Sequence, residues 1–264
     1  MRHALLLLLV GAAVVMAARL APGQDERPGI IGQDDRVRLD AKGPPWDAIG
    51  QVNVAGFDRV DICTGTLTSP NLVITAAHCV MNPWKKIPYL LDDIHFVAGV
   101  RGETFKGHAK ARCLHFLRNY KFVPPDKISP EMPSEVRIES FATDAVAIVL
   151  DRTLGVTPAP LAENVTLRPD LPLVHVAYPL DHRFMPWVHR GCHLLQPDPE
   201  LRVWFNDCDT FPGSSGGPVF VLDTDGTPKL AAIMVGGSEG EADDANIALP
   251  LPEWIELTGN TKCP

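Results

Sequence analysis

The sequence lacks three features that would point to nucleic acids, zinc or membranes. Its 24 Lys and Arg residues are outnumbered by 32 Asp and Glu residues, so the formal net charge is -8 and nucleic acid is an unfavourable partner. The six cysteines contain no C-x-x-C pair, which argues against a zinc ribbon. After the N-terminal segment, no apolar run reaches the length of about 18 residues that a membrane span needs.

The first 18 residues have the composition of a signal peptide. A short apolar stretch occupies 4–16, and the sequence VMA at 15–17 offers a small-residue cleavage site. A membrane anchor is the alternative, but this run is shorter than about 18 residues. We interpret 1–18 as a signal peptide and the polar segment 19–29 as a propeptide or loose arm. We therefore expect a secreted or periplasmic monomer without membrane contact after signal removal.

The rest of the chain is expected to be all-β. Short apolar runs are separated by turn residues, and the sequence shows neither strand–helix alternation nor an internal repeat. Many short strands with turn signals between them are typical of a β-sandwich or β-barrel. The expected strands are Gln51–Val54, Leu72–Thr75, Ile94–Ala98, Ala145–Leu150, Leu173–Ala177, Arg202–Phe205, Val219–Leu222 and Leu230–Val235.

Three segments are expected to lie outside the strands. Residues 124–140 are Pro-rich and polar, which indicates a surface loop. Residues 151–172 hold four prolines and suit a linker between two β units. Residues 252–257 are expected to form a short helix, because Pro252 suits its first position and Gly259 its C-terminal end.

The segment Asp209–Phe220, with the sequence DTFPGSSGGPVF, places Ser215 in a glycine-rich turn. Such a turn can expose one hydroxyl and leave backbone N–H groups free, which is what acyl transfer needs. A glycine-rich hairpin turn is the alternative. The G-x-S-x-G elbow of α/β-hydrolases also fits, but it requires a later histidine. All nine histidines precede Ser215, so only the order His, Asp, Ser remains.

His78 and Asp144 are the candidates for the other two positions. His78 follows the expected strand 72–75 within TAAHC, where small residues and Cys79 would hold an imidazole rigidly as a general base requires. Asp144 stands at the head of the apolar run 145–150, where an ionised carboxylate is costly unless it is paired. A packing histidine and a strand-end cap are the alternatives.

Taken together, these three pieces resemble chymotrypsin-like serine proteases in order and in spacing, at about 65 to 70 residues apart. The resemblance runs from Ile30 to the C-terminus. It implies two antiparallel six-stranded β-barrels, at 30–155 and 156–250, with the active site in the cleft between them. A short C-terminal helix and tail would occupy 251–264.

Finer features resemble the bacterial branch that includes the glutamyl endopeptidases. They are Ile31–Arg36, Val176–Pro179 and Asp209–Thr210.

The resemblance also implies roles for the site residues. Ser215 would be the nucleophile, His78 its general base and then acid, and Asp144 the residue that orients His78. The N–H groups of Gly213 and Ser215 would form the oxyanion hole. The implied function is a secreted serine endopeptidase that cleaves protein or peptide substrates through an acyl-enzyme, without cofactor or metal. A catalytically inactive binding protein of this fold and an esterase are the alternatives.

The family's specificity pocket would be built here from Asp209, Thr210, Met234, Gly236 and Gly237. Met234 stands where glutamyl endopeptidases place a histidine, so a glutamate preference is not expected. Asp209 stands where trypsin-like members carry the carboxylate that reads Lys or Arg. Glutamyl members also carry an aspartate there, and a structural turn residue is the alternative. A basic or apolar preference is expected, with basic ahead on charge.

The same resemblance bears on activation and on one disulfide, and the other two pairs rest on position around Ser215 and on elimination. Ser214 stands where animal zymogens carry the aspartate that pairs with a new N-terminal amine, so that switch is not expected. Six cysteines allow fifteen connectivities. The family's bridge beside the catalytic histidine corresponds to Cys63–Cys79. The other expected pairs are Cys192–Cys208 and Cys113–Cys263.

Two groups of residues are weak candidates for metal binding, and a solvated loop is the preferred interpretation of each. The spacing of the first matches no metal signature, and the second is not an EF-hand loop. The two groups are His182, His189 and His193, and Glu239, Glu241, Asp243 and Asp244.

Overall fold

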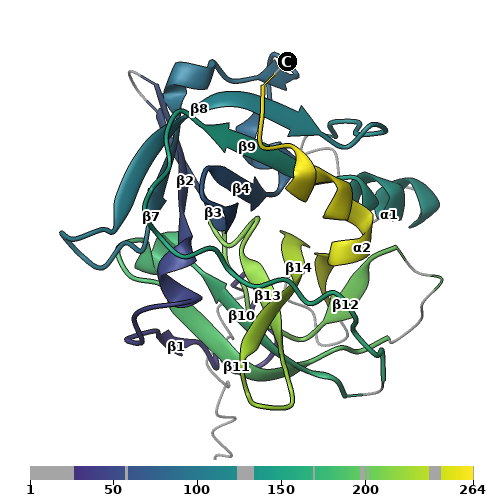
Figure 1. The fold of residues 1–264 in the computed structure, drawn as a ribbon. Helices are drawn as coiled ribbons and strands as arrows, with labels where there is room; N and C mark the ends of the chain where they lie inside the picture. The colour runs from purple at the N-terminus through teal and green to yellow at the C-terminus, as the bar shows by residue number, and fades with distance from the viewer. Residues whose placement is uncertain are drawn as a thin grey trace, which may run out of the picture.

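The structure, a computed structural model, describes residues 27–56, 59–123, 134–168, 170–196, 200, 202–237 and 245–263. Its strands form two neighbouring β-structures, a closed barrel from the first half of the chain and a curled sheet from the second (Figure 1). The predicted all-β class is confirmed. The expected signal peptide at 1–18 lies outside the described residues.

The first barrel is antiparallel and closed, with its six strands in the order β2-β3-β4-β9-β8-β7. Strands β4 and β9 are buried along their whole length, which fits their continuous apolar sequences LVIT and VAIVL. Strand β7 instead alternates buried and half-buried residues, as a strand with one face on the core does. The strands are β2 (Ile49–Gly56), β3 (Arg59–Ser69), β4 (Leu72–Thr75), β7 (Ile94–Ala98), β8 (Gly107–Phe116) and β9 (Val146–Leu150).

The register of β4 against β9 decides which segments meet at one end of this barrel. The two strands are antiparallel, and Thr75 pairs with Val146. The residues that follow β4 therefore lie beside the residues that precede β9. This register brings 76–80 next to 141–145, the two segments that hold His78 and Asp144.

The second β-structure is a seven-stranded antiparallel sheet in the order β1-β11-β10-β13-β14-β15-β12. An isolated bridge between Leu194 and Asn206 joins the end of β11 to β12, so six strands curl round on themselves and β1 adds an edge beyond them. The strands are β1 (Val37–Arg38), β10 (Pro172–Ala177), β11 (Trp187–His193), β12 (Trp204–Asn206), β13 (Pro218–Leu222), β14 (Pro228–Gly236) and β15 (Asn246–Pro250).

Short elements connect the two β-structures and cover their ends. Arg202 joins the two α-helices, donating to Glu139 at 2.8 Å and to Glu253 at 2.7 Å. Trp254 is fully buried, and its indole N–H donates to the carbonyl of Leu249. These elements are β5 (Met81–Asn82), β6 (Ile87–Pro88), α1 (Ser134–Ala142), α2 (Leu251–Trp254), η1 (Trp46–Ala48), η2 (Ala77–Val80), η3 (Leu91–Asp93), η5 (Leu180–His182) and η6 (Ile255–Gly259).

The structure contains three disulfide bonds among the described residues, and each joins an expected pair. They are Cys63–Cys79, Cys113–Cys263 and Cys192–Cys208. The first fixes η2 to β3, the second holds the C-terminal tail on β8, and the third joins β11 to the segment after β12, where the curled sheet meets itself.

Helix α1 and several strands depart from the sequence prediction. The loop expected at 124–140 was wrong for its described part, because helix α1 begins at Ser134. Strands β3, β8 and β11 were not predicted, since glycines and charged residues interrupt their apolar pattern, and the short β15 with the sequence NIALP was missed as well. Residues 151–168 and 170–171 contain no strand, as the linker prediction requires.

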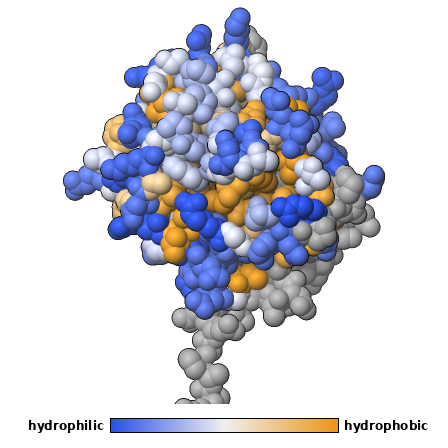
Figure 2. Space-filling model, turned by 60° about the horizontal axis from the view of Figure 1, so that its bottom comes forward, coloured by the Kyte–Doolittle hydropathy of each residue, from blue (hydrophilic) through white to orange (hydrophobic). Residues whose placement is uncertain are grey.

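The surface is mostly hydrophilic, but apolar side chains gather in the middle of one face (Figure 2). None of the helices within the described ranges is long and apolar enough to cross a membrane.

Thr64 of β3 connects the first barrel to the turn that holds Ser215. Its N–H donates to the carbonyl of Ser215 at 2.9 Å, and its carbonyl accepts from the hydroxyl of Thr75 at 2.7 Å. Its own hydroxyl donates to the carbonyl of Gly213 and accepts from the N–H of Tyr178, both at 2.9 Å. Every polar group of this fully buried residue is therefore paired.

We expect Thr64→Val to destabilise the protein. Valine keeps the shape but leaves the Gly213 carbonyl and the Tyr178 N–H buried without partners, at about 1–3 kcal/mol each. The free energy of unfolding from a urea titration should fall by about 2–4 kcal/mol.

Thr66→Val is the matched control on the same strand. The hydroxyl of Thr66 is buried and has no hydrogen-bond partner in the described part of the chain, so its removal should not lower stability. Equal losses in the two variants would contradict the role assigned to Thr64.

Candidate active site

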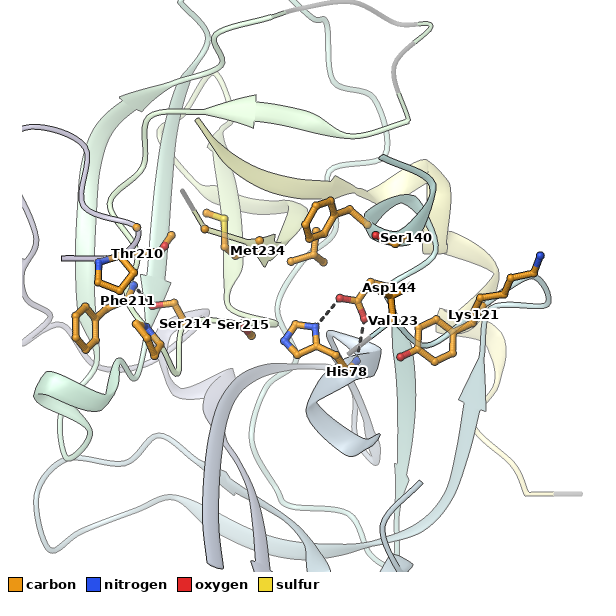
Figure 3. Close-up of a pocket in the computed structure, with 18 residues that line it drawn as sticks. His78, Lys121, Val123, Ser140, Asp144, Thr210, Phe211, Ser214, Ser215 and Met234 are labelled. Carbon is orange, nitrogen blue, oxygen red and sulfur yellow. Dashed lines mark hydrogen bonds and ion pairs between the residues drawn. The ribbon is translucent and has the colours of Figure 1, made fainter. Parts of the chain in front are cut away.

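A cavity of about 370 Å³ lies between the two β-structures and contains the three residues singled out in the sequence. The first barrel contributes His78 and Asp144, and the second sheet contributes Ser215 and Met234 (Figure 3). The complete lining is Pro28, Gly29, His78, Tyr120, Lys121, Val123, Ser140, Phe141, Asp144, Thr210, Phe211, Pro212, Ser214, Ser215, Met234, Val235, Gly236 and Gly237.

His78 and Asp144 form a hydrogen-bonded pair. The backbone N–H of His78 donates to Oδ1 of Asp144 at 2.8 Å, and its ring Nδ1 lies 2.5 Å from Oδ2. The C-terminal end of α1 leads into Asp144, whose N–H donates to the carbonyl of Phe141. The buried alanines before His78 and the Cys63–Cys79 disulfide hold the other side. The backbone at His78 and the backbone at Asp144 are thus each held by contacts of their own, apart from the contact between the two side chains.

The charge of Asp144 favours the protonated form of His78. Burial by itself lowers the pKa of the His78 imidazole, but the charge of Asp144 and the hydrogen bond outweigh burial, so this pKa lies above its ordinary value. The bond to Asp144 assigns the proton of the neutral ring to Nδ1 and leaves Nε2 as an acceptor. Figure 3 shows the second ring nitrogen pointing away from Asp144, toward Ser215.

The turn before Ser215 closes on itself. The N–H of Ser214 donates to the carbonyl of Phe211 at 2.8 Å, and the N–H of Phe211 donates to the hydroxyl of Ser214 at 3.1 Å. Pro212 and Gly213 occupy its centre, and Gly213 has φ +98°, the positive value that a type II turn needs at that position. Ser214 thus stabilises the turn without an ion pair to an N-terminal amine.

This turn leaves two N–H groups available. In the part of the chain that the structure describes, the N–H groups of Gly213 and Ser215 donate to no protein acceptor. Those of Gly216 and Gly217 are instead paired, with Met234 and with Ser214. The free donors are the two that the resemblance assigns to an oxyanion hole.

Gly216 has to be glycine because the first barrel packs directly against it. Its φ is +75°, and a Cβ there would lie 2.0 Å from Thr75 Oγ1 and 2.3 Å from the carbonyl oxygen of Thr64. The glycine-rich shoulder of Ser215 is therefore a contact surface between the two β-structures. The arrangement supplies a hydroxyl, a ring nitrogen that accepts a proton, and two donors for a developing negative charge.

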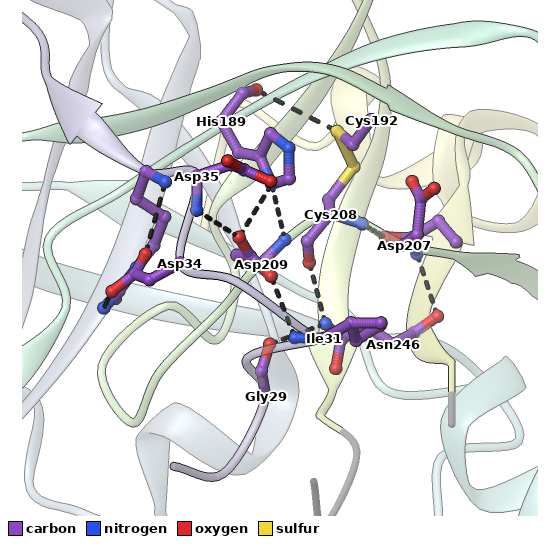
Figure 4. Close-up of polar contacts among 12 residues, drawn as sticks. Gly29, Ile31, Asp34, Asp35, His189, Cys192, Asp207, Cys208, Asp209 and Asn246 are labelled. Atoms are coloured by element: carbon purple, nitrogen blue, oxygen red, sulfur yellow. Dashed lines mark hydrogen bonds and ion pairs between the residues drawn. A yellow bond between two sulfur atoms is a disulfide. The ribbon is translucent and has the colours of Figure 1, made fainter. Parts of the chain in front are cut away.

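Four of the five residues expected in a specificity pocket line this cavity, and Asp209 does not. Thr210, Met234, Gly236 and Gly237 are in the lining. Asp209 is only 1% exposed, and its carboxylate accepts the N–H groups of Ile31 and Asp35 instead of facing a substrate (Figure 4). Both oxygens of this carboxylate are thus engaged by backbone N–H groups of 31–35.

Several lining residues carry no signal in the sequence that would have placed them in the site. Tyr120 and Phe141 belong to segments without a recognisable motif. Gly236 makes room for Phe141, since a Cβ there would lie 2.8 Å from the ring. Pro28 and Gly29 were assigned to a loose arm, yet Gly29 is buried against Thr210. The backbone φ of Gly29 is +82°, and this conformation could not be read from the sequence.

The three candidate histidines do not form one metal site. His182 stacks on Trp187 at 3.7 Å between ring centroids, and His193 lies 3.6 Å from an oxygen of Asp207. His189, Asp35 and Asp209 offer ligand atoms within 4.8 Å of one another, but both Asp209 oxygens already accept backbone N–H groups. The four candidate acidic residues, Glu239, Glu241, Asp243 and Asp244, lie outside the described residues.

Comparison with known proteins gives consistent results. A family model described as "Trypsin-like peptidase domain" matches residues 63–228. The "Modular serine protease" of Drosophila melanogaster is 27% identical over 152 residues, which cover 51% of this chain and 20% of that protein. A solved Glu endopeptidase in complex with MPD has a TM-score of 0.67 at 20% identity, over 88% of this chain and 99% of that one. At that identity, the structural similarity shows the fold alone.

We expect Asp144→Asn to lower the pKa of His78 below its ordinary value. The substitution removes the charge that favours the imidazolium but leaves burial, which disfavours it. An NMR titration of the ring checks this. Asp151→Asn is the control, because Asp151 lies near His108 and should not affect His78. An unchanged His78 pKa in Asp144→Asn would contradict the pairing.

Proposed function

The chain belongs to the trypsin-like peptidase domain family, and from this premise we propose that it is a secreted serine endopeptidase acting through His78, Asp144 and Ser215. One observation carries the proposal. The paired His78 and Asp144 of the first barrel and Ser215 of the second sheet line one cavity. Beside Ser215, its own N–H and that of Gly213 have no protein acceptor among the described residues. A structural histidine or a plain hairpin turn would not require this convergence.

The proposed reaction follows the mechanism of the family. Ser215 Oγ attacks the peptide carbonyl while its proton passes to His78 Nε2, and the N–H groups of Gly213 and Ser215 bind the oxyanion. His78 then gives the proton to the amine as the C–N bond breaks, which leaves an acyl-enzyme. Water repeats the sequence on the ester, restores Ser215 and releases the acid. Asp144 keeps the imidazole oriented and stabilises its charged form throughout.

Three disulfides support the proposed export. Such bonds persist in oxidising compartments, outside the cell or in the periplasm, and form rarely in the cytosol. They agree with the signal peptide predicted at 1–18.

The lining of the cavity supports a preference for apolar residues before the scissile bond. Met234 is 2% exposed in the wall, and Asp209 is turned away. Lys121 is the lining's lysine, but Figure 3 shows its side chain pointing outward, away from Ser215. An unpaired charge buried in such a pocket is costly, so neither Glu nor Lys and Arg is favoured. The basic preference expected from Asp209 is replaced by an apolar one.

Replacing the nucleophile should abolish peptidase activity. Ser215→Ala is expected to fold normally and to lose about 10⁴- to 10⁶-fold in kcat, since the triad acts as a unit. Labelling by a fluorophosphonate, which needs an activated serine, should disappear as well. Ser214→Ala is the neighbouring control and should remain labelled, although more slowly because its hydroxyl closes the turn.

The same assay separates the alternatives. A wild-type protein that the probe does not label would be an inactive protein of this fold. A labelled protein that turns over simple esters but no peptide would be an esterase. Either result would overturn the endopeptidase assignment.

We expect a peptide-library digest to show cleavage after Phe, Met and Leu. An uncompensated charge in the cavity should reduce kcat/KM for Glu, Lys and Arg by at least about tenfold. Cleavage mainly after any of these charged residues would contradict the apolar pocket, whether or not Ser215 is labelled.

A further inference from the structure

Residues 27–36 form part of the cavity, and they are called the N-terminal arm from here on. They overlap the segment 19–29 only at its end. Pro28 and Gly29 belong to the lining, although both precede the first strand. The carbonyl of Gly29 accepts the N–H of Thr210 at 2.8 Å and the side-chain amide of Asn246 at 2.9 Å. The arm is thus hydrogen-bonded to the second sheet beside the substrate pocket.

Gly29 packs closely against Thr210 and Gly237. A Cβ on Gly29 would lie 2.3 Å from Thr210 Oγ1, and a Cβ on Gly237 would lie 3.7 Å from Gly29 Cα. The φ of Gly29 is +82°, which L side chains rarely adopt. A Cβ on Gly237 would also lie 3.3 Å from Thr210 Oγ1, so Gly29, Thr210 and Gly237 pack against one another at that end of the pocket.

Asp209 holds this arm in place (Figure 4). Its Oδ1 accepts the N–H of Ile31 at 2.9 Å, and its Oδ2 accepts the N–H of Asp35 at 2.8 Å. The backbone N–H of Asp209 donates to His189 Nδ1 at 2.8 Å, which fixes the backbone at Asp209. A residue that only shaped a local turn would bond within that turn, whereas both carboxylate oxygens here bond to the arm.

The bonds also explain how a buried carboxylate is tolerated. Asp209 is 1% exposed, and an unpaired charge in such a place is costly. Burial raises the pKa of Asp209, and the N–H groups of Ile31 and Asp35 offset part of that effect. The arm and the carboxylate consequently depend on each other.

We propose that Asp209 is a positioning residue for the substrate pocket, acting through the N-terminal arm. By holding Ile31 and Asp35, it keeps the Gly29 backbone against Thr210 as a wall of the site. It thereby shapes the pocket instead of reading a substrate charge. This inference rests on the proposed function, because a pocket wall has this meaning only if the cavity binds substrate.

The test compares variants on the two sides of the contact in the full-length protein. Asp209→Ala removes both acceptors, and Gly29→Ala places a methyl group on Thr210 without touching Asp209. Each should raise KM for an apolar peptide substrate by about tenfold, which corresponds to one or two lost hydrogen bonds. Both kcat and the rate of fluorophosphonate labelling should stay within about threefold of wild type, because the small probe does not need this wall.

Two controls isolate the contact from general strain. Gly32→Ala introduces the same side chain at φ +74°, but nothing lies within 4 Å of its Cβ. Asp207→Asn changes a neighbouring aspartate that bonds to His193 instead of the arm. Both should keep the wild-type KM, and thermal melting should show that all four variants are folded.

The double variant Asp209→Ala/Gly29→Ala decides the mechanism. If Asp209 acts through the arm, the double variant should have the KM of a single variant, because both disrupt one contact. Multiplied effects, or an unchanged KM in folded Asp209→Ala, would overturn the inference. So would a selective loss of cleavage after Lys or Arg, which would make Asp209 a charge reader. A wild-type protein that the probe does not label would instead contradict the proposed function.

Discussion

Thr64 joins the two β-structures through three hydrogen bonds, a fourth connects it to Thr75 in its own barrel, and the geometry of the site depends on them. One bond holds the carbonyl of Ser215 and another holds that of Gly213. Thr64 therefore fixes the turn whose N–H groups at Gly213 and Ser215 have no protein acceptor among the described residues. The fourth reaches Thr75, whose strand leads to His78. A single buried residue therefore relates the proposed base to the proposed nucleophile, and the close packing at Gly216 leaves neither side room to shift.

Two buried aspartates illustrate how backbone context assigns different work to the same side chain. Asp144 lies at the cavity and accepts both from the backbone and from the ring of His78, so its charge acts on an imidazole. Asp209 lies six residues before Ser215 but accepts from two backbone N–H groups of the N-terminal arm. Its charge therefore stabilises the position of that arm. Both satisfy the requirement that a buried carboxylate be paired.

The sequence predicted elements with clear apolar patterns and three residues that line one cavity, but not the contacts that folding makes between distant backbone segments. The β-class, the strands 72–75 and 94–98 and the C-terminal helix follow from apolar patterns and Pro or Gly signals. Strands β3 and β8 carry glycine and charge, and their pairing partners determine them. The orientation of Asp209 could not be predicted, because it depends on the arm 174 residues earlier in the chain at Asp35.

The separation of the proposed triad between the two β-structures has a consequence for how the protein is made. A folding chain whose first barrel alone is complete holds His78 and Asp144 together, but it has no ordered turn to present Ser215. Conversely, the turn that holds Ser215 lacks its contacts with Thr64 and Thr75 until that barrel is present. On the proposed function, a complete triad therefore exists only once the two β-structures have docked, and a half-folded molecule has none.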